Sequence, residues 1–439
     1  MSHNSYIRWL YQELPELVRS GTLAPEAAEK LKTHYGPPPA GAGRRVALTV
    51  CGILGATLIG GGIILLFAHN WSALSRSTRT VLALAPLLAT HILTLWALAT
   101  GRTSRVWRES TGMLVTLMLA AAIALVGQTY HIPGNLANFL LVWMLLTLPL
   151  IYLLEATVPA LIYLPGITAW AGLAQVEYGH AVWFLPLLAL VLPHLALVLR
   201  RDPYGSRATF LGWMLVICLF VATGESLEKI LPGLWIIVYG ALATGFYLAG
   251  RRWMAAAPST WRNPFASAGA LGIVVIALLL TYDEFWNNVG WRHWRTGWAY
   301  NWRVGTLDYL ILAGLSAVST WMLLHTARRR DVLGLAFGAL LPVTVLGYLL
   351  ASSGFEGPAI ILCNAYLLAL VLTITVTGLR ENRTGLVNGG LLTLSTLIVA
   401  RFFDEEFSFV MRGCAFIAIG IAFLIANVLM SRRGKGAAP

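Results

Sequence analysis

The chain has 439 residues, of which 58% are hydrophobic and only 11% are charged. A soluble domain carries about 25% charged residues, and a soluble core of this length could not hide so much apolar surface. The composition therefore excludes a soluble globular protein and predicts an all-α, polytopic bundle of about fourteen transmembrane helices. The net charge of +12 does not predict a nucleic-acid partner, because the basic residues follow the membrane topology described below.

Residues 1–45 precede the first apolar segment and predict a short cytosolic helical hairpin followed by a linker. Apolar residues at helical spacing indicate a first helix over residues 5–20. Gly21 suits the end of this helix, and Pro25 suits the first turn of the next. A hairpin this small buries little apolar surface alone. We therefore expect residues 1–36 to dock on the membrane domain or on another membrane or cytosolic protein.

Residues 46–430 form the predicted transmembrane domain, in which apolar segments follow one another with short polar connections. A spanning helix needs about 20 residues. The predicted spans are 46–68, 78–100, 110–127, 136–154, 157–174, 181–199, 208–224, 231–250, 267–282, 307–326, 332–350, 358–378, 384–400 and 411–430.

The basic residues alternate in density between successive loops. With the N-terminus inside, 23 of the 31 Lys and Arg residues fall on the inner side, including those of the basic tail 431–439, and eight fall on the outer side. Cytoplasmic loops carry an excess of positive charge. The pattern predicts a multi-pass protein with both termini in the cytoplasm. Membrane lipids are the expected partners, since anionic headgroups attract the excess charge.

Polar residues end three of the predicted spans on the outer side. These are His69, Asn70 and Trp71; Gln128, Tyr130 and His131; and Arg401, Asp404 and Glu405. Such residues either cap helix ends and contact lipid headgroups, or form a polar cluster that borders a functional site. A polar side chain within the membrane interface needs a partner. We expect Arg401 to pair with Asp404, about one helical turn further on.

The predicted outer loop 283–306 is rich in tryptophan, and Trp286 is the first tryptophan in it. Within it, Trp291, Trp294, Trp298 and Trp302 share one face at helical spacing, with Arg292 and Arg295 nearby. Tryptophan prefers the membrane–water boundary, because its ring is apolar and its N–H is polar. The loop predicts either an interfacial helix that lies flat as an anchor or an aromatic platform for a sugar or lipid headgroup.

The sequence contains no pattern typical of a metal or cofactor site. There is no paired HxxxH or CxxC motif, no phosphate-binding loop and no nucleophile elbow. No charged residue lies near the middle of a predicted span, where ion-coupled transporters commonly keep one. We expect no cofactor and no metal, and the sequence indicates no catalytic residue.

Several blocks of the sequence resemble known families. The opening block from Tyr6 to Gly36, the end of the first span at Ala68-His69-Asn70-Trp71, and the segment Gln128-Thr129-Tyr130-His131 resemble the bacterial predicted-membrane-protein family called domain of unknown function 2157. The stretch from Asn388 through Arg401-Phe402-Phe403-Asp404 to Gly413 is similar to a related family, 4401. The resemblance implies placement in the bacterial inner membrane and implies no activity.

Three classes of function remain open. A transporter or flippase-like protein for a lipid-linked or amphipathic substrate is favoured by the number of helices and by the aromatic and charged outer loops. A non-catalytic membrane scaffold or sensor is favoured by the hairpin and by the lack of mid-membrane charge. A membrane-embedded transferase using a lipid-linked donor is supported only by the outer acidic residues, so the sequence favours a protein that is not an enzyme. A lipid-filled lateral cavity would favour the first class, and a tightly packed bundle the second. A metal or sugar-phosphate held by Asp404, Glu405 or Asp283 would favour the third.

Overall fold

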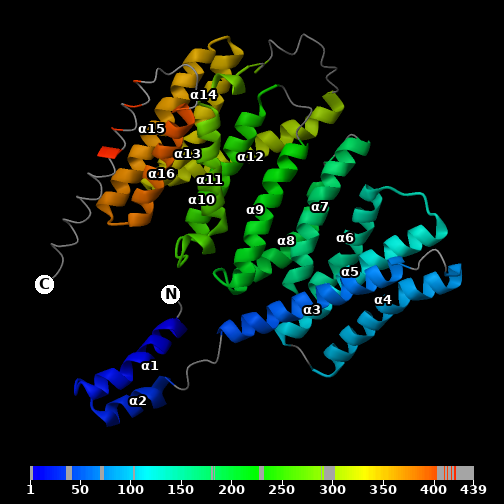
Figure 1. The fold of residues 1–439 in the computed structure, drawn as a ribbon. Helices are drawn as coiled ribbons and strands as arrows, with labels where there is room; N and C mark the ends of the chain where they lie inside the picture. The colour runs from blue at the N-terminus through cyan, green and yellow to red at the C-terminus, as the bar shows by residue number, and fades with distance from the viewer. Residues whose placement is uncertain are drawn as a thin grey trace. The chain divides into compact units, whose positions relative to one another are not determined.

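The computed structural model describes residues 3–35, 42–69, 74–101, 104–178, 181, 183–226, 232–287, 289–290, 302–402, 410, 413, 417 and 420–421. The regular secondary structure of these residues is helical throughout, which confirms the predicted all-α class (Figure 1). The chain divides into two compact units. The first comprises Met1–Ala174 with Phe184–Asp202, and the second comprises Gln175–Trp183 with Pro203–Pro439.

The first unit contains a short N-terminal helix pair and the helices that follow it. These are α1 (His3–Arg19), α2 (Pro25–Tyr35), α3 (Ala42–His69), α4 (Arg76–Ala99), α5 (Arg105–Tyr130), α6 (Leu136–Leu153), most of α7 (Thr157–Tyr178), and α8 (Phe184–Arg201). The second unit contains α9 (Ser206–Ser226), α10 (Trp235–Trp253), η2 (Thr260–Arg262), α11 (Pro264–Leu279), η3 (Asp283–Phe285), α12 (Trp302–Arg328), α13 (Val332–Gly338), α14 (Leu340–Ser352), α15 (Glu356–Arg380) and α16 (Thr384–Phe402).

Most of these helices suit a bilayer. The described part of the chain contains nine helical segments that are long and apolar enough to cross a membrane. Three shorter apolar helical segments cover Val50–Gly62, Pro264–Leu279 and Thr384–Ala400. Every predicted span from 46–68 to 384–400 coincides with a helix, or with the consecutive helices α13 and α14 in the case of 332–350. The polytopic bundle is therefore confirmed. The predicted span 411–430 lies almost wholly outside the described residues.

Helices α1 and α2 form the hairpin that the sequence predicts. The chain turns at Gly21, whose φ of +71° lies in the left-handed region that glycine adopts without strain. Leu14 of α1 and Ala28 of α2 are buried, and the Tyr11 hydroxyl donates to the carbonyl oxygen of Lys32 at 3.3 Å. The contact between the two helices is thus small and mostly apolar.

A carboxylate from α5 holds the start of α7. Glu109 is only 7% exposed, and its carboxylate oxygens accept hydrogen bonds from the N–H of Thr157 at 2.9 and 2.8 Å and from the N–H of Val158 at 2.8 Å. The first N–H groups of a helix have no acceptor within the helix, and negative charge is favoured at this end of the helix dipole. Glu109 therefore fixes α5 against the N-terminus of α7.

Helices α10 and α11 cross at glycines in the second unit. A Cβ atom on Gly269 would lie 2.4 Å from the backbone nitrogen of Tyr247, and one on Gly250 would lie 2.2 Å from the backbone nitrogen of Ala266. Backbone atoms cannot move aside as a flexible side chain can. Small residues therefore allow the two backbones to approach closely, as they do in membrane helix pairs.

The first part of the predicted outer loop 283–306 is packed into the core of the second unit. Trp286 is 0% exposed, and its indole N–H donates to the carbonyl oxygen of Leu280 at 2.9 Å. Its ring lies against Gly347, where an added Cβ atom would be 2.6 Å from the ring. The N–H of Gly290 donates to the carbonyl oxygen of Pro232 at 2.9 Å. Trp286 and Gly290 are thus tied to the segments around them.

Candidate functional site

The end of α5 contains the part of the predicted polar cluster whose side chains the structure describes. Gln128 and His131 are exposed. Tyr130 is also exposed, and its hydroxyl lies 2.9 Å from the Thr80 hydroxyl of α4, where either group can donate. His131 has a φ of 51° and ends the helix in the left-handed conformation. These side chains thus lie at one end of the α4–α5 pair.

The remaining predicted site side chains lie outside the described part of the chain. They are His69, Asn70, Trp71, Arg401, Asp404 and Glu405 of the polar cluster, and Trp291, Arg292, Trp294, Arg295, Trp298 and Trp302 of the aromatic platform. The backbone places His69 at the end of α3, Arg401 near the end of α16 and Trp302 at the start of α12. The pairing of Arg401 with Asp404, and the platform, therefore stay predictions.

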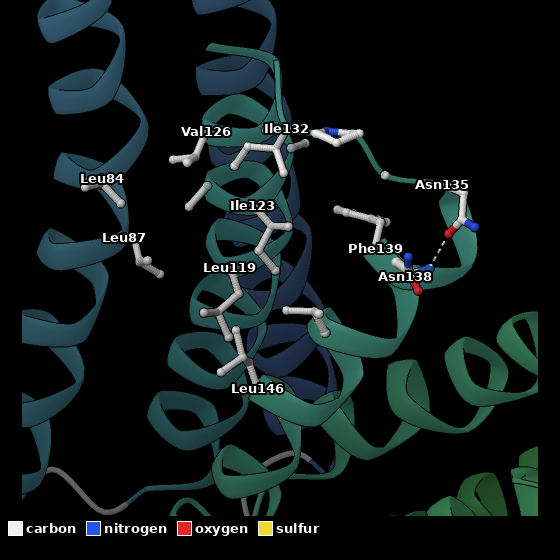
Figure 2. Close-up of a pocket in the computed structure, with 16 residues that line it drawn as sticks. Leu84, Leu87, Leu119, Ile123, Val126, Ile132, Asn135, Asn138, Phe139 and Leu146 are labelled. Carbon is white, nitrogen blue, oxygen red and sulfur yellow. Dashed lines mark hydrogen bonds between the residues drawn. The ribbon is translucent and has the colours of Figure 1, made fainter. Parts of the chain in front are cut away.

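A groove of about 570 Å³ lies between α4, α5 and α6, next to the α5–α6 connection (Figure 2). We call it the α4–α6 groove. Its walls consist of aliphatic and aromatic side chains from all three helices. They include Leu84 and Leu87 of α4, Leu119, Ile123 and Val126 of α5, and Phe139, Val142 and Leu146 of α6. No charged residue lines it. The sequence reasoning did not identify these wall residues.

One end of the groove is polar. The connection from Ile132 to Asn135 lines this end, and the Asn135 side-chain oxygen accepts a hydrogen bond from the N–H of Asn138 at 2.8 Å, which caps the start of α6. Figure 2 shows the two asparagines beside the connection, whereas Leu146 lies further from it. The groove therefore runs from a polar end into an apolar interior.

This arrangement suits an amphipathic molecule. Its volume lies within the range of about 300–1,000 Å³ typical of small-molecule sites. The hydrocarbon of a bilayer is as apolar as leucine, so a hydrocarbon chain of a bound molecule gains little free energy merely by moving from lipid to the groove. Selectivity would therefore come from the shape of the walls and from the polar groups at the end, where a headgroup or linker would lie.

Metal-ligating side chains do not gather in the described residues. No group of three or more His, Cys, Asp or Glu side chains there could hold a metal ion. The described cysteines are free: Cys51 is exposed, and Cys218 and Cys363 are buried. The groove is thus the feature of the first unit that best fits a ligand.

The fold defines a polytopic helical membrane protein, and an apolar groove lies between α4, α5 and α6. Residues 15–160 match the model of a family described as predicted membrane protein (DUF2157). The matched segment includes every residue that lines the α4–α6 groove. The resemblance to this family is thereby confirmed for that part of the chain, and the likeness of the C-terminal part to family 4401 stays a prediction. No curated protein matches the chain, and no solved structure matches it.

Proposed function

We propose that the protein is a transporter or flippase-like protein, and that it holds the hydrocarbon part of a lipid-linked or amphipathic molecule in the α4–α6 groove. The observation that carries this proposal is the combination of apolar walls with a polar end in one groove of about 570 Å³. A membrane amphiphile has the same division between a long apolar part and a compact polar part. The exposed side chains of Gln128 and His131, at the same end of α5, are available to contact the polar part.

The proposal includes an orientation in the membrane. The distribution of Lys and Arg supports cytoplasmic termini, and with this topology the α5–α6 connection faces the outer side. The polar end of the groove would then lie at the outer headgroup level of the bacterial inner membrane. An amphiphile bound there would enter from, or leave into, the outer leaflet.

A non-catalytic scaffold or sensor is the second candidate. The tight packing of the second unit favours it, since Trp286 is fully buried and the α10–α11 crossing leaves no space for a Cβ atom at Gly250 or Gly269. A scaffold would also bind lipid in the groove but would not move it between leaflets. The two candidates therefore differ in whether the protein moves lipid from one leaflet to the other.

A flip assay separates these candidates. The full chain is reconstituted in vesicles that carry fluorescent phosphatidylethanolamine in both leaflets, and dithionite bleaches the outer leaflet. We expect bleaching to proceed beyond the outer half of the label, because the protein brings inner lipid to the outer side. Gly127→Trp should return bleaching toward half. Gly127 lines the groove, and an added Cβ atom there meets nothing within 4 Å, so the indole can occupy the groove without a backbone clash.

The matched control is Gly55→Trp on α3. A Cβ atom at Gly55 also meets nothing within 4 Å, but this residue does not line the groove. The control should flip lipid as the unmodified protein does. Bleaching that stops at half with unmodified protein, for phosphatidylethanolamine, phosphatidylglycerol and a fluorescent isoprenoid phosphate alike, would refute lipid movement and favour the scaffold.

A further inference from the structure

A small basic cavity lies at the ends of α10, α12 and α13 in the second unit. It has a volume of about 60 Å³. Its polar lining includes Arg251 and Arg252 from the end of α10, His325 from the last turn of α12, and Arg329 and Asp331 from the connection to α13. Three arginines thus surround one carboxylate.

The carboxylate of Asp331 is already occupied. Arg251 donates from Nε to Oδ2 at 2.9 Å and from Nη2 to Oδ1 at 2.8 Å. The same carboxylate accepts the N–H of Gly334 at 3.0 Å and caps α13. This bidentate pair neutralises Arg251. Within the described residues, neither Arg252 nor Arg329 forms a salt bridge, so their charge faces the cavity uncompensated.

Aromatic contacts hold two of the polar groups beside the cavity. The guanidinium carbon of Arg252 lies 5.1 Å from the ring centre of Trp321, and the His325 ring stacks on the same indole at 6.2 Å. A cation over an indole face is attracted by the ring quadrupole. His325 Nε2 is buried, and no hydrogen-bond partner for it is found among the described residues. Buried polar atoms normally have a partner, so this nitrogen would suit an added ligand.

We propose that this cavity binds the phosphate group of an anionic phospholipid. A cavity of about 10–15 Å³ already holds one water, so about 60 Å³ leaves room for a phosphate-sized group. Guanidinium groups match the geometry of phosphate oxygens. The site lies in the second unit and is separate from the α4–α6 groove, so the proposal goes beyond the proposed function.

The surface of α12 next to the cavity favours a lipid over a free anion. Val318 and Trp321 are 56% and 54% exposed. With His325 they step by three and four residues and so share one helical face. An acyl chain attached to a phosphate in the cavity can lie along this face. The predicted topology puts the cavity at the cytoplasmic headgroup level, where basic pockets between spanning helices bind anionic headgroups.

Ligand-dependent thermal stability of the purified full chain in neutral detergent tests the proposal. The added probes are short-chain phosphatidylglycerol, short-chain phosphatidylcholine and inorganic phosphate, each titrated separately. We expect phosphatidylglycerol to bind more tightly than phosphatidylcholine by a factor on the order of ten, because each basic residue near a membrane surface strengthens anionic lipid binding severalfold. Inorganic phosphate alone should give no shift over the same concentration range.

Charge-removing variants locate the effect. The double variant Arg252→Gln, Arg329→Gln should lose the preference for phosphatidylglycerol. The control Arg200→Gln, Arg380→Gln removes two exposed arginines that are also predicted to lie on the inner side, and it should keep the preference. Gly127→Trp should keep it too, since the groove lies in the other unit. The double variant could have a lower melting temperature than the unmodified protein even without lipid. In that case the single variant Arg329→Gln, at an exposed residue, should still weaken the preference for phosphatidylglycerol.

Three outcomes would overturn the proposal. Equal affinity for the two lipids would show that the cavity does not select an anionic headgroup. A preference that survives in both the double variant and Arg329→Gln would place the anion elsewhere. A shift from inorganic phosphate that equals the shift from phosphatidylglycerol would show an anion site without a lipid.

Discussion

Trp286→Ala is expected to lower the free energy of unfolding by about 3–5 kcal/mol, the range for removing a fully buried aromatic side chain. The indole is 0% exposed. Its removal leaves a cavity against Gly347 and leaves the Leu280 carbonyl oxygen without the hydrogen bond that Trp286 donates. Reversible unfolding in mixed micelles, followed as the fraction of denaturing detergent rises, measures the change.

Trp253→Ala is the matched control for this variant. Trp253 ends α10 in the same unit and is 65% exposed, so its loss removes few contacts within the protein. We expect a change below about 1 kcal/mol, because substitutions on the surface rarely have large effects. If the two variants lose the same stability, the indole of Trp286 does not pack in the core as described.

Glu109→Ala is expected to lower the free energy of unfolding by about 3 kcal/mol, because hydrogen bonds to a charged group contribute about 1.5–3 kcal/mol each and water replaces part of the loss. The substitution leaves the N–H groups of Thr157 and Val158 without the carboxylate that accepts from them. The same unfolding measurement applies. Proteolysis near residue 157 should also become faster if the start of α7 loosens.

Two variants provide the comparison for Glu109→Ala. Glu109→Gln keeps one acceptor oxygen and removes the charge. It should therefore lower the free energy of unfolding by less than Glu109→Ala does. Glu29→Ala breaks an exposed ion pair with Lys32 at 2.8 Å, and such pairs contribute less than about 1 kcal/mol. Equal losses for Glu109→Ala and Glu29→Ala would mean that the Glu109 carboxylate does not hold α7.

The sequence predicts the helices well because their causes are local. Runs of apolar residues of bilayer length, broken by short polar joints, correspond to helices from 46–68 to 384–400. The α1–α2 hairpin is equally readable, since Gly21 adopts the left-handed conformation and Pro25 opens the next helix. Each of these signals depends on neighbours in the chain.

The candidate site depends on contacts between distant residues, and the sequence indicates only its edge. The polar segment from Gln128 to His131 was recognisable, and it lies at the end of the helix that lines the groove. The residues of the groove walls cannot be recognised from the sequence. An apolar residue such as Ile123 or Val142 looks the same in sequence whether it faces lipid, a neighbouring helix or a cavity. Only the packing of α4, α5 and α6 separates these cases.

Two further residues show the same limit. Trp286 belongs by sequence to a tryptophan-rich loop, and tryptophan is common both at membrane interfaces and in cores. Its burial depends on Gly347, which is far along the chain. Glu109 is a charged residue near the start of a helix, and its acceptor role becomes visible only when Thr157, 48 residues later, lies beside it.

Photocrosslinking tests most directly whether the α4–α6 groove holds the hydrocarbon part of a membrane amphiphile. The full chain is placed in bilayers that contain a phospholipid with a diazirine in the middle of its acyl chain, and the adducts are mapped by mass spectrometry after illumination. The structure predicts adducts concentrated on groove residues such as Ile123, Phe139 and Val142, and their loss in Gly127→Trp but not in Gly55→Trp. Adducts spread equally over exposed residues of α4 outside the groove, such as Leu88 and Ile92, and unchanged by Gly127→Trp, would contradict it.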